Sequence, residues 1–293
     1  MRIALLAFLI AFCIFSAALE ASPKLQTPRS RGHLILIGGG KKPSKVLHKF
    51  VALAGGPSSP IVVIPTASSL SDTGSYYEEL FAEEAGCKKV KVLPIETRED
   101  AENADYVAAI DKACGLFFSG GDQSRITSAL SDSPSGNAIA RLYERGGVIG
   151  GTSAGTACQS KLMITGNGDF SVIKEKNVEL KPGLGLFPAI IIDQHFIARQ
   201  RQNRLISVIL ENPLLLGVGV DEASAVWLKP NLTFEVLGES SVFVYDASKA
   251  TIRRSKESSE RPGRGYLGVT GLRTHILLPG DRFSLARRTV VDG

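Results

Sequence analysis

The sequence is poor in the residues that build metal sites and disulfide frameworks. It has four cysteines and four histidines among 293 residues. The cysteines are too far apart in the chain for a zinc-ligand motif or a disulfide framework. We therefore expect no metal, and we expect Cys87, Cys114 and Cys158 to be buried free thiols. A single disulfide is the alternative.

Charge of one sign is not concentrated anywhere in the chain. The net charge is +5 with 22% charged residues, and no Lys/Arg stripe is interleaved with aromatic residues, so we do not expect a nucleic-acid partner. A hydrophobic content of 44% is ordinary for a globular protein and supplies one sizeable core. The length permits one large α/β domain or two small ones.

Long hydrophobic runs are absent beyond the N-terminus. A basic start at residues 1–2 is followed by an apolar run at 3–15 and by small residues at 16–18 and 21. This order predicts a secretory signal peptide over residues 1–21, cleaved after Ala18 or Ala21. We expect a secreted or periplasmic protein that does not touch the membrane after cleavage; the alternative is an uncleaved N-terminal anchor, although the run is short for a span.

Short β-branched runs then alternate with longer helix-compatible stretches. Residues 22–32 are polar and predict a disordered lead-in. The expected strands are 33–37, 61–64, 90–93, 116–118 and 148–149, and the expected helices between them are 43–53, 76–85, 98–113 and 123–145. The runs are too continuous for burial on one side only. The alternation predicts a doubly wound, mostly parallel α/β sheet with helices on both faces.

The second half of the chain shifts to β structure. We expect a strand at 189–193, a helix at 198–211 and a strand at 215–220, followed from about residue 223 by strands at 225–228, 233–237, 241–245 and 275–278. No internal repeat or linker interrupts this pattern. We therefore predict one domain over residues 33–293 with a β-rich C-terminal part.

The strongest local signal is a G-x-S-x-G sequence at residues 151–155, directly after a predicted strand and before a helix-compatible run. This order is typical of a nucleophile elbow, in which glycines relieve crowding around a serine in a strained turn. It makes Ser153 a candidate nucleophile. A purely structural Gly-rich turn is the alternative.

His195 stands at the end of a predicted buried strand, where α/β sheets place their sites. A histidine there could accept the serine proton and return it to a leaving amine; a structural histidine is the alternative.

Another Gly-rich turn, at 118–123, could bring a backbone N–H to an oxyanion or be only a tight turn. Three arginines follow His195. Guanidinium groups beside a nucleophile suggest that they bind substrate carboxylates. The alternative is that these arginines form a solvent-exposed face at the start of a helix. They are Arg199, Arg201 and Arg204.

These segments together resemble the cyanophycinase family, the peptidase S51 group of serine peptidases. The resemblance rests on LILIGGG, VIPTAS, FSGGDQ, GGTSAG, IDQHF with R-x-R-x-x-R after it, and GVGVDEASA, which occur in that order from about residue 33 to about 245. It implies a class I glutamine-amidotransferase-like α/β fold. It also implies cleavage of cyanophycin, a polyaspartate that carries arginine on its side-chain carboxyls, into β-Asp-Arg dipeptides, without a cofactor.

The resemblance also implies residue roles. Ser153 becomes the nucleophile, His195 its base, and the N–H groups of Gly121 and Ala154 the oxyanion hole. The implied substrate-binding residues are Gln123, Asp193, Gln194, Arg199, Arg201 and Arg204.

The resemblance also implies an acid that orients the histidine, a glutamate about eighteen residues after the serine, where this chain has Ser171. Asp169, two residues earlier, is our candidate for that role, and Glu175 is a second one. Loss of such an acid can cost about 10⁴-fold in rate.

The sequence thus predicts a serine exopeptidase whose substrate is a peptide or polymer with free carboxylates and arginine. An aspartyl dipeptidase of other specificity is one alternative. A catalytically degenerate binding protein on the same scaffold is another, because fold alone does not settle function. The oligomeric state stays open, a homodimer included.

Overall fold

The computed structural model describes residues 32–187, 189–255 and 265–292. The predicted signal peptide (1–21) lies outside these residues, and so does the predicted lead-in (22–32) except for Gly32, which is buried at the start of the first strand. Within the described ranges, no helix combines the length and the apolar character needed to cross a membrane.

Nine strands form the main sheet, in the order β17-β16-β11-β10-β1-β5-β4-β2-β3. The parallel half consists of β1 (His33–Ile37), β2 (Ile61–Ile64), β3 (Val90–Val92), β4 (Gly115–Phe118) and β5 (Val148–Thr152). The antiparallel half consists of β10 (Ser224–Leu228), β11 (Thr233–Gly238), β16 (Arg282–Ser284) and β17 (Thr289–Val291). Every residue of β2, β4 and β5 is buried. Because these strands are buried on both faces, their sequences are continuous apolar runs.

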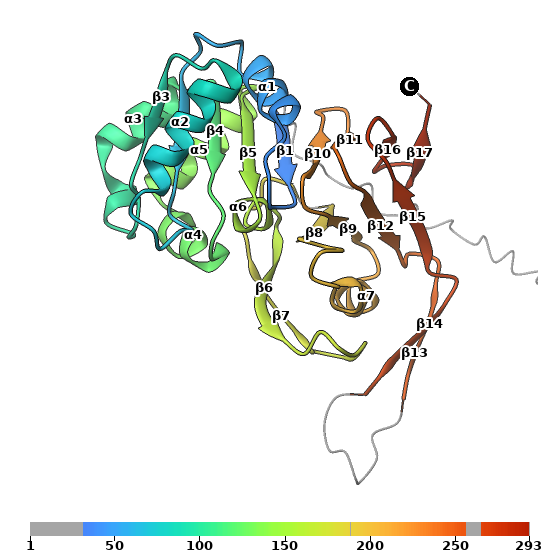
Figure 1. The fold of residues 1–293 in the computed structure, drawn as a ribbon. Coiled ribbons are helices and arrows are strands. Elements are labelled where there is room, and N and C mark those ends of the chain that lie inside the picture. The colour runs from blue at the N-terminus through green and yellow to red at the C-terminus, as the bar shows by residue number, and fades with distance from the viewer. Residues whose placement is uncertain (1–31, 188, 256–264, 293) are drawn as a thin grey trace, which may run out of the picture.

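Helices cover both faces of the parallel half (Figure 1). On one face lie α1 (Ser44–Leu53) and α2 (Thr73–Ala85), where Phe50, Phe81 and Phe117 form an aromatic cluster. The other face is covered by α3 (Ala104–Lys112), α4 (Gln123–Leu130), α5 (Pro134–Glu144) and α6 (Ala154–Ala157), with the short 3₁₀ helix η1 (Asp100–Glu102) before α3.

The run expected as one helix over 123–145 is two helices. Ser133 accepts the Gly136 N–H and so caps α5, whose first residue is Pro134. Both residues favour a new helix start.

A second sheet, ordered β15-β12-β9-β8, lies against the first. It contains β8 (Ile190–Gln194), β9 (Leu216–Val220), β12 (Val242–Asp246) and β15 (Arg273–Leu277), and α7 (Gln202–Glu211) covers its outer face. Ile192 and Val218 on its inner face belong to the same core cluster as Leu36 of β1. The two sheets therefore share one core.

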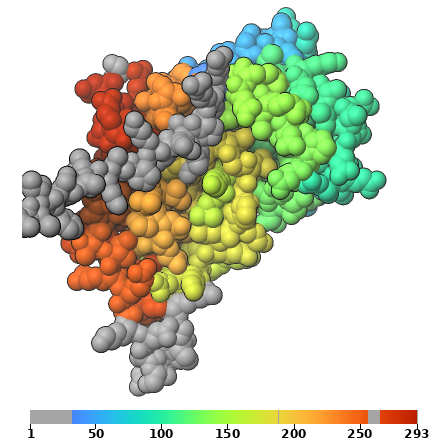
Figure 2. Space-filling view, turned by 180° about the vertical axis from the view of Figure 1, so that it is seen from behind, coloured from blue at the N-terminus to red at the C-terminus, as the bar shows by residue number. Residues whose placement is uncertain are grey.

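Two hairpins extend beyond the sheets: β6 (Leu162–Gly168) with β7 (Val178–Pro182), and β13 (Thr251–Arg254) with β14 (Leu267–Thr270) (Figure 1). Seen from behind, the green N-terminal half and the orange-to-red C-terminal part lie on opposite sides, with yellow residues between them (Figure 2). The predicted α/β sheet and the β-rich C-terminal part are both confirmed. Cys87, Cys114 and Cys158 are free thiols; Cys87 and Cys158 are buried and Cys114 is half-buried.

Candidate active site

Ser153 forms the turn between β5 and α6. Its backbone angles are φ 53° and ψ −113°, a combination that non-glycine residues seldom adopt and that functional sites retain. Its N–H donates to the Ile37 carbonyl at 3.0 Å. The Thr156 hydroxyl donates to the carbonyls of Ile37 at 2.7 Å and Gly151 at 2.8 Å. The predicted elbow geometry is therefore present and is held against the end of β1.

The glycines beside this serine allow the elbow to approach β4. A Cβ atom at Gly155 would stand 2.5 Å from the Phe118 carbonyl oxygen, and one at Gly151 would stand 2.2 Å from the Gly155 carbonyl oxygen. Any larger residue would push the serine away from the strand ends.

His195 follows β8 and lies between Ser153 and Glu222. Its Nε2 is 2.7 Å from the Ser153 Oγ, and its Nδ1 is 2.5 Å from Glu222 Oε1. An ionised carboxylate only accepts hydrogen bonds, so the neutral ring carries its proton on Nδ1. Nε2 is then free to accept the Ser153 hydroxyl proton. The three side chains have the arrangement of a nucleophile, a base and an orienting acid.

Burial lowers the pKa of His195 from its ordinary value of 6.5, because the charged ring loses solvation. The hydrogen bond and charge of Glu222 act in the opposite direction, while the nearby charges of Arg199 and Arg201 lower the pKa further. The net shift is downward, so the ring is neutral at pH 7 and ready to act as a base.

Glu222 reaches the histidine because β8 and β9 are parallel neighbours. The register pairs Gln194 with Val220, so the residues just beyond these strand ends lie side by side. The preceding residue, Asp221, accepts the N–H groups of Ile197 and Ala198, each at 3.0 Å. The Asp221–Glu222 pair thus clamps the backbone after His195 and holds its ring.

The glycines after β1 form the wall behind the histidine. Gly39 has φ +123°, and a Cβ atom there would lie 2.2 Å from Cε1 of His195. At Gly40 a Cβ atom would lie 2.8 Å from an oxygen of Glu222. The Gly38 carbonyl accepts the His195 N–H at 2.7 Å. Only glycine fits at position 39, which gives the LILIGGG segment a role that sequence reasoning missed.

The structure corrects the expected position of the orienting acid. Asp169 is exposed and accepts hydrogen bonds from the Ser171 N–H at 3.0 Å and the Ser171 hydroxyl at 2.6 Å. Glu175 pairs with Arg254. Neither acid is bonded to His195, where Glu222 is found instead. A signal was present: Glu222 lies two residues after a buried strand, in the GVGVDEASA segment, and strand ends converge in α/β folds.

Arg204 and Asp193, both expected to contact substrate, are paired with each other. The Arg204 Nε donates to Asp193 Oδ2 at 2.8 Å, and a second bond joins Nη2 to Oδ1. Their side chains are 1% and 0% exposed, and the Phe170 ring covers the guanidinium at 4.6 Å. In this structure the pair has no surface for a substrate and instead joins α7 to β8.

Arg201 is the N-cap of α7 rather than part of a helical Arg face, because the helix starts at Gln202, later than expected. It donates to the Gln194 carbonyl at 2.5 Å. Burial, followed by the charge of Arg204, lowers the pKa of Arg201 to about 10, so it stays cationic at pH 7. Arg199 is exposed and lines the cavity of Ser153.

The two glutamines are buried. Gln123 donates from Nε2 to the Ile164 carbonyl at 2.7 Å, and Gln194 is only 5% exposed. Substrate contact by Gln123, Gln194, Arg199 and Arg201 stays a prediction.

The cavity over Ser153 has a volume of about 390 Å³, within the range of small-molecule sites. Gly120 and Gly121 after β4 line it together with Ser153 and His195. Ala154 is the first residue of α6, where a helix has no acceptor for its N–H. Gly121 and Ala154 are thus both next to the nucleophile, and their role as oxyanion donors stays a prediction.

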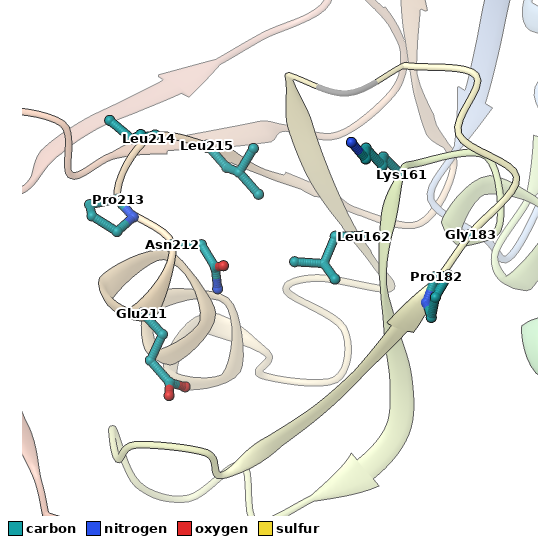
Figure 3. A pocket seen from close by; sticks show the side chains of 9 residues that line it. All are labelled: Lys161, Leu162, Pro182, Gly183, Glu211, Asn212, Pro213, Leu214 and Leu215. Carbon is teal, nitrogen blue, oxygen red and sulfur yellow. The ribbon is translucent and has the colours of Figure 1, made fainter.

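A wider cavity of about 880 Å³ lies between the β6–β7 hairpin and the C-terminal end of α7 (Figure 3). Leu162 and Asn212 point toward each other across it (Figure 3). Its walls are mostly apolar and contain no serine, cysteine or histidine. Of these two cavities, the smaller one therefore contains the side chains suited to hydrolysis.

Comparison with known proteins identifies the family. The family model of peptidase family S51 matches residues 34–234. A cyanophycinase of Nostoc sp. is 36% identical over 278 residues, covering 92% of this chain and 91% of that protein. A cyanophycinase of Geminocystis herdmanii is 34% identical over 260 residues, covering 87% and 94% of the two chains.

Solved structures show the same fold. A peptidase from an acI-B1 Actinobacterium superposes with a TM-score of 0.64 at 20% identity, covering 87% of this chain and 98% of that one. A putative peptidase E from Listeria monocytogenes gives a TM-score of 0.51 at 16% identity, covering 71% and 99%. The glutamine-amidotransferase-like fold expected from the sequence is confirmed. With the family model matching well over half of its length, the chain belongs to peptidase family S51 and is a hydrolase of the serine peptidase type.

Proposed function

We propose that this protein is an exopeptidase that hydrolyses cyanophycin, or related β-linked aspartyl peptides, to β-Asp-Arg dipeptides, with Ser153, His195 and Glu222 as its catalytic residues. The observation that carries the proposal is the relay of 2.7 Å from the Ser153 Oγ to His195 and 2.5 Å from His195 to Glu222. The curated relatives named cyanophycinase support the substrate.

The proposed reaction is an acyl transfer in two halves. His195 Nε2 takes the hydroxyl proton as the Ser153 Oγ attacks the scissile carbonyl, and Glu222 stabilises the imidazolium that forms. The N–H groups of Gly121 and Ala154 are the proposed donors to the oxyanion. His195 then gives the proton to the leaving amine. His195 then takes a proton from a water molecule as its oxygen attacks the acyl carbon, and returns that proton to the Ser153 Oγ as the acyl–oxygen bond breaks and the acid product leaves.

Incubation of the purified protein with cyanophycin tests the proposal directly. We expect mass spectrometry to find β-Asp-Arg dipeptides, and a fluorophosphonate probe to label Ser153. Release of aspartate from simple Asp-containing dipeptides, with cyanophycin left intact, would favour the aspartyl dipeptidase instead. A protein that neither labels nor releases product would be a binding protein on this scaffold.

The pH dependence of Ser153 reactivity should report the neutral imidazole. The base is competent above the pKa of His195 and is lost as the ring is protonated below it. Labelling by a neutral fluorophosphonate should therefore rise with pH, with its midpoint below the ordinary histidine pKa of 6.5. Arg199 lowers this pKa, so Arg199→Met should move the rising limb to higher pH. Arg287→Met, on an exposed residue between β16 and β17, is the matched control. An unmoved limb in Arg199→Met would contradict the electrostatic role.

Export is proposed from the N-terminal sequence alone. The basic start, apolar run and small residues of 1–21 support a cleaved signal peptide and a secreted or periplasmic location.

A further inference from the structure

The charged side chains that line the cavity over Ser153 are all positive. Among the described residues that line it, Lys42 and Arg199 are cationic and none is acidic, while His195 is neutral at pH 7. A cavity of this kind attracts carboxylates and repels guanidinium groups. The carboxylates of a substrate should therefore lie inside it, and an arginine side chain should lie outside.

Lys42 is held in place by two aromatic rings. Its Nζ lies 5.3 Å from the ring centroid of Tyr76 and 5.4 Å from that of Tyr77, within the range of a cation–π contact. The two rings meet edge to face at 5.1 Å, and the Tyr77 ring, 3% exposed, lies 5.4 Å from Phe117 in the core. A lysine side chain is normally flexible. Here the rings give its ammonium group a defined position at the cavity wall.

The charge of Lys42 has no carboxylate partner among the ion pairs of the described residues, whereas the neighbouring Lys41 lies 3.8 Å from Glu239. A half-buried cation without an anion gains from one that arrives with the substrate. The terminal β-Asp-Arg unit of the proposed polymer offers two free carboxylates, one on aspartate and one on arginine, and the cavity offers two cations.

We propose that Lys42, held on the Tyr76–Tyr77 pair, is a specificity residue that binds a carboxylate of the substrate in the cavity of Ser153. This inference rests on the proposed function and extends it, since it names a recognition group that the sequence analysis did not assign. Lys42 acts on binding and takes no part in proton transfer.

The test compares three variants on cyanophycin. Lys42→Met keeps the unbranched side chain and removes the charge, and we expect KM to rise by roughly ten-fold with little change in kcat, the pattern of lost uniform binding. Lys42→Arg keeps a cation over the rings and should retain most of the affinity. Lys41→Met removes the adjacent lysine outside the cavity lining and should behave as the wild type.

A second measurement asks whether the partner of Lys42 is a carboxylate. The substrates are synthetic trimers of β-Asp-Arg with their arginine and terminal aspartate carboxylates free or converted to amides. The wild type should lose affinity for the amides, and Lys42→Met should discriminate between the two forms by a smaller factor. Equal discrimination by both proteins would overturn the proposal.

Labelling of Ser153 by a neutral fluorophosphonate separates the failure of this inference from failure of the proposed function. Equal labelling in wild type and Lys42→Met, with a raised KM only in the variant, supports the inference. Equal labelling with an unchanged KM overturns it and leaves the proposed function standing. Loss of labelling in Lys42→Met would mean that Lys42 shapes the site itself, which also overturns it. A wild type that neither labels nor cleaves cyanophycin would overturn both.

Discussion

Ser153→Ala is expected to lower kcat on cyanophycin by about 10⁶-fold, the scale of loss seen when a triad nucleophile is removed. The substitution deletes the oxygen that lies 2.7 Å from His195 Nε2 and leaves the Cβ atom in place. Alanine meets the same backbone constraint at φ 53° as serine does. The fold should therefore persist, with an unchanged melting temperature and circular dichroism spectrum.

The control for this variant is Ser171→Ala, the same chemical change at an exposed serine that bonds to Asp169 instead of His195. It should keep wild-type kcat. His195→Ala should be nearly as damaging as Ser153→Ala, and the double variant no worse than either, because members of such a relay act as a unit. Near-normal turnover in Ser153→Ala would refute the assignment of the nucleophile.

Glu222→Gln is expected to lower kcat by up to about 10⁴-fold. Glutamine has nearly the same size as glutamate, but it has no charge to stabilise the imidazolium and it no longer imposes the proton on Nδ1. Because Glu222 raises the pKa of His195, its neutralisation should also move the rising limb of the Ser153 labelling profile to lower pH. A residue with only a packing role would not move that limb.

Asp169→Asn is the matched comparison, since it neutralises the acid that the sequence favoured. Asp169 is exposed and bonded to Ser171, so we expect no change in kcat beyond about two-fold, the scale of a surface substitution. Ser171→Glu should not restore activity to Glu222→Gln. A steep loss in Asp169→Asn with a silent Glu222→Gln would return the orienting role to the loop between β6 and β7.

The local sequence pattern was enough to predict the strands and the turn that position the site. The strands predicted at 33–37 and 61–64 coincide with β1 and β2, because β-branched residues buried on both faces leave few alternatives to a central strand. The G-x-S-x-G turn predicted Ser153 for a similar reason: its strain and its glycines are properties of five consecutive residues. His195 followed from its place at a strand end.

The boundary of α7 and the roles around it did not follow from the sequence. An Arg-x-Arg-x-x-Arg segment at a helix start looks like an exposed basic face, yet Arg204 is 1% exposed because Asp193 on β8 faces it across the core. Arg199 alone of the three arginines is exposed in the cavity. Which arginine meets solvent depends on what α7 packs against, and that partner lies on another element.

The residues that complete the site are determined by pairing between segments far apart in the chain. Ser153, His195 and Glu222 are 42 and 27 residues apart, and no local pattern joins them. The register of β8 on β9, Gln194 opposite Val220, brings Glu222 to the histidine. The register of β1 on β5, Ile37 opposite Thr152, brings Gly39 and Lys42 to the serine. The sequence by itself determined the strands, the elbow and the histidine, because these depend on neighbours in the chain. Only the tertiary structure decided which acid bonds to the histidine and which cations line the cavity over Ser153, because parallel pairing selects which strand ends meet.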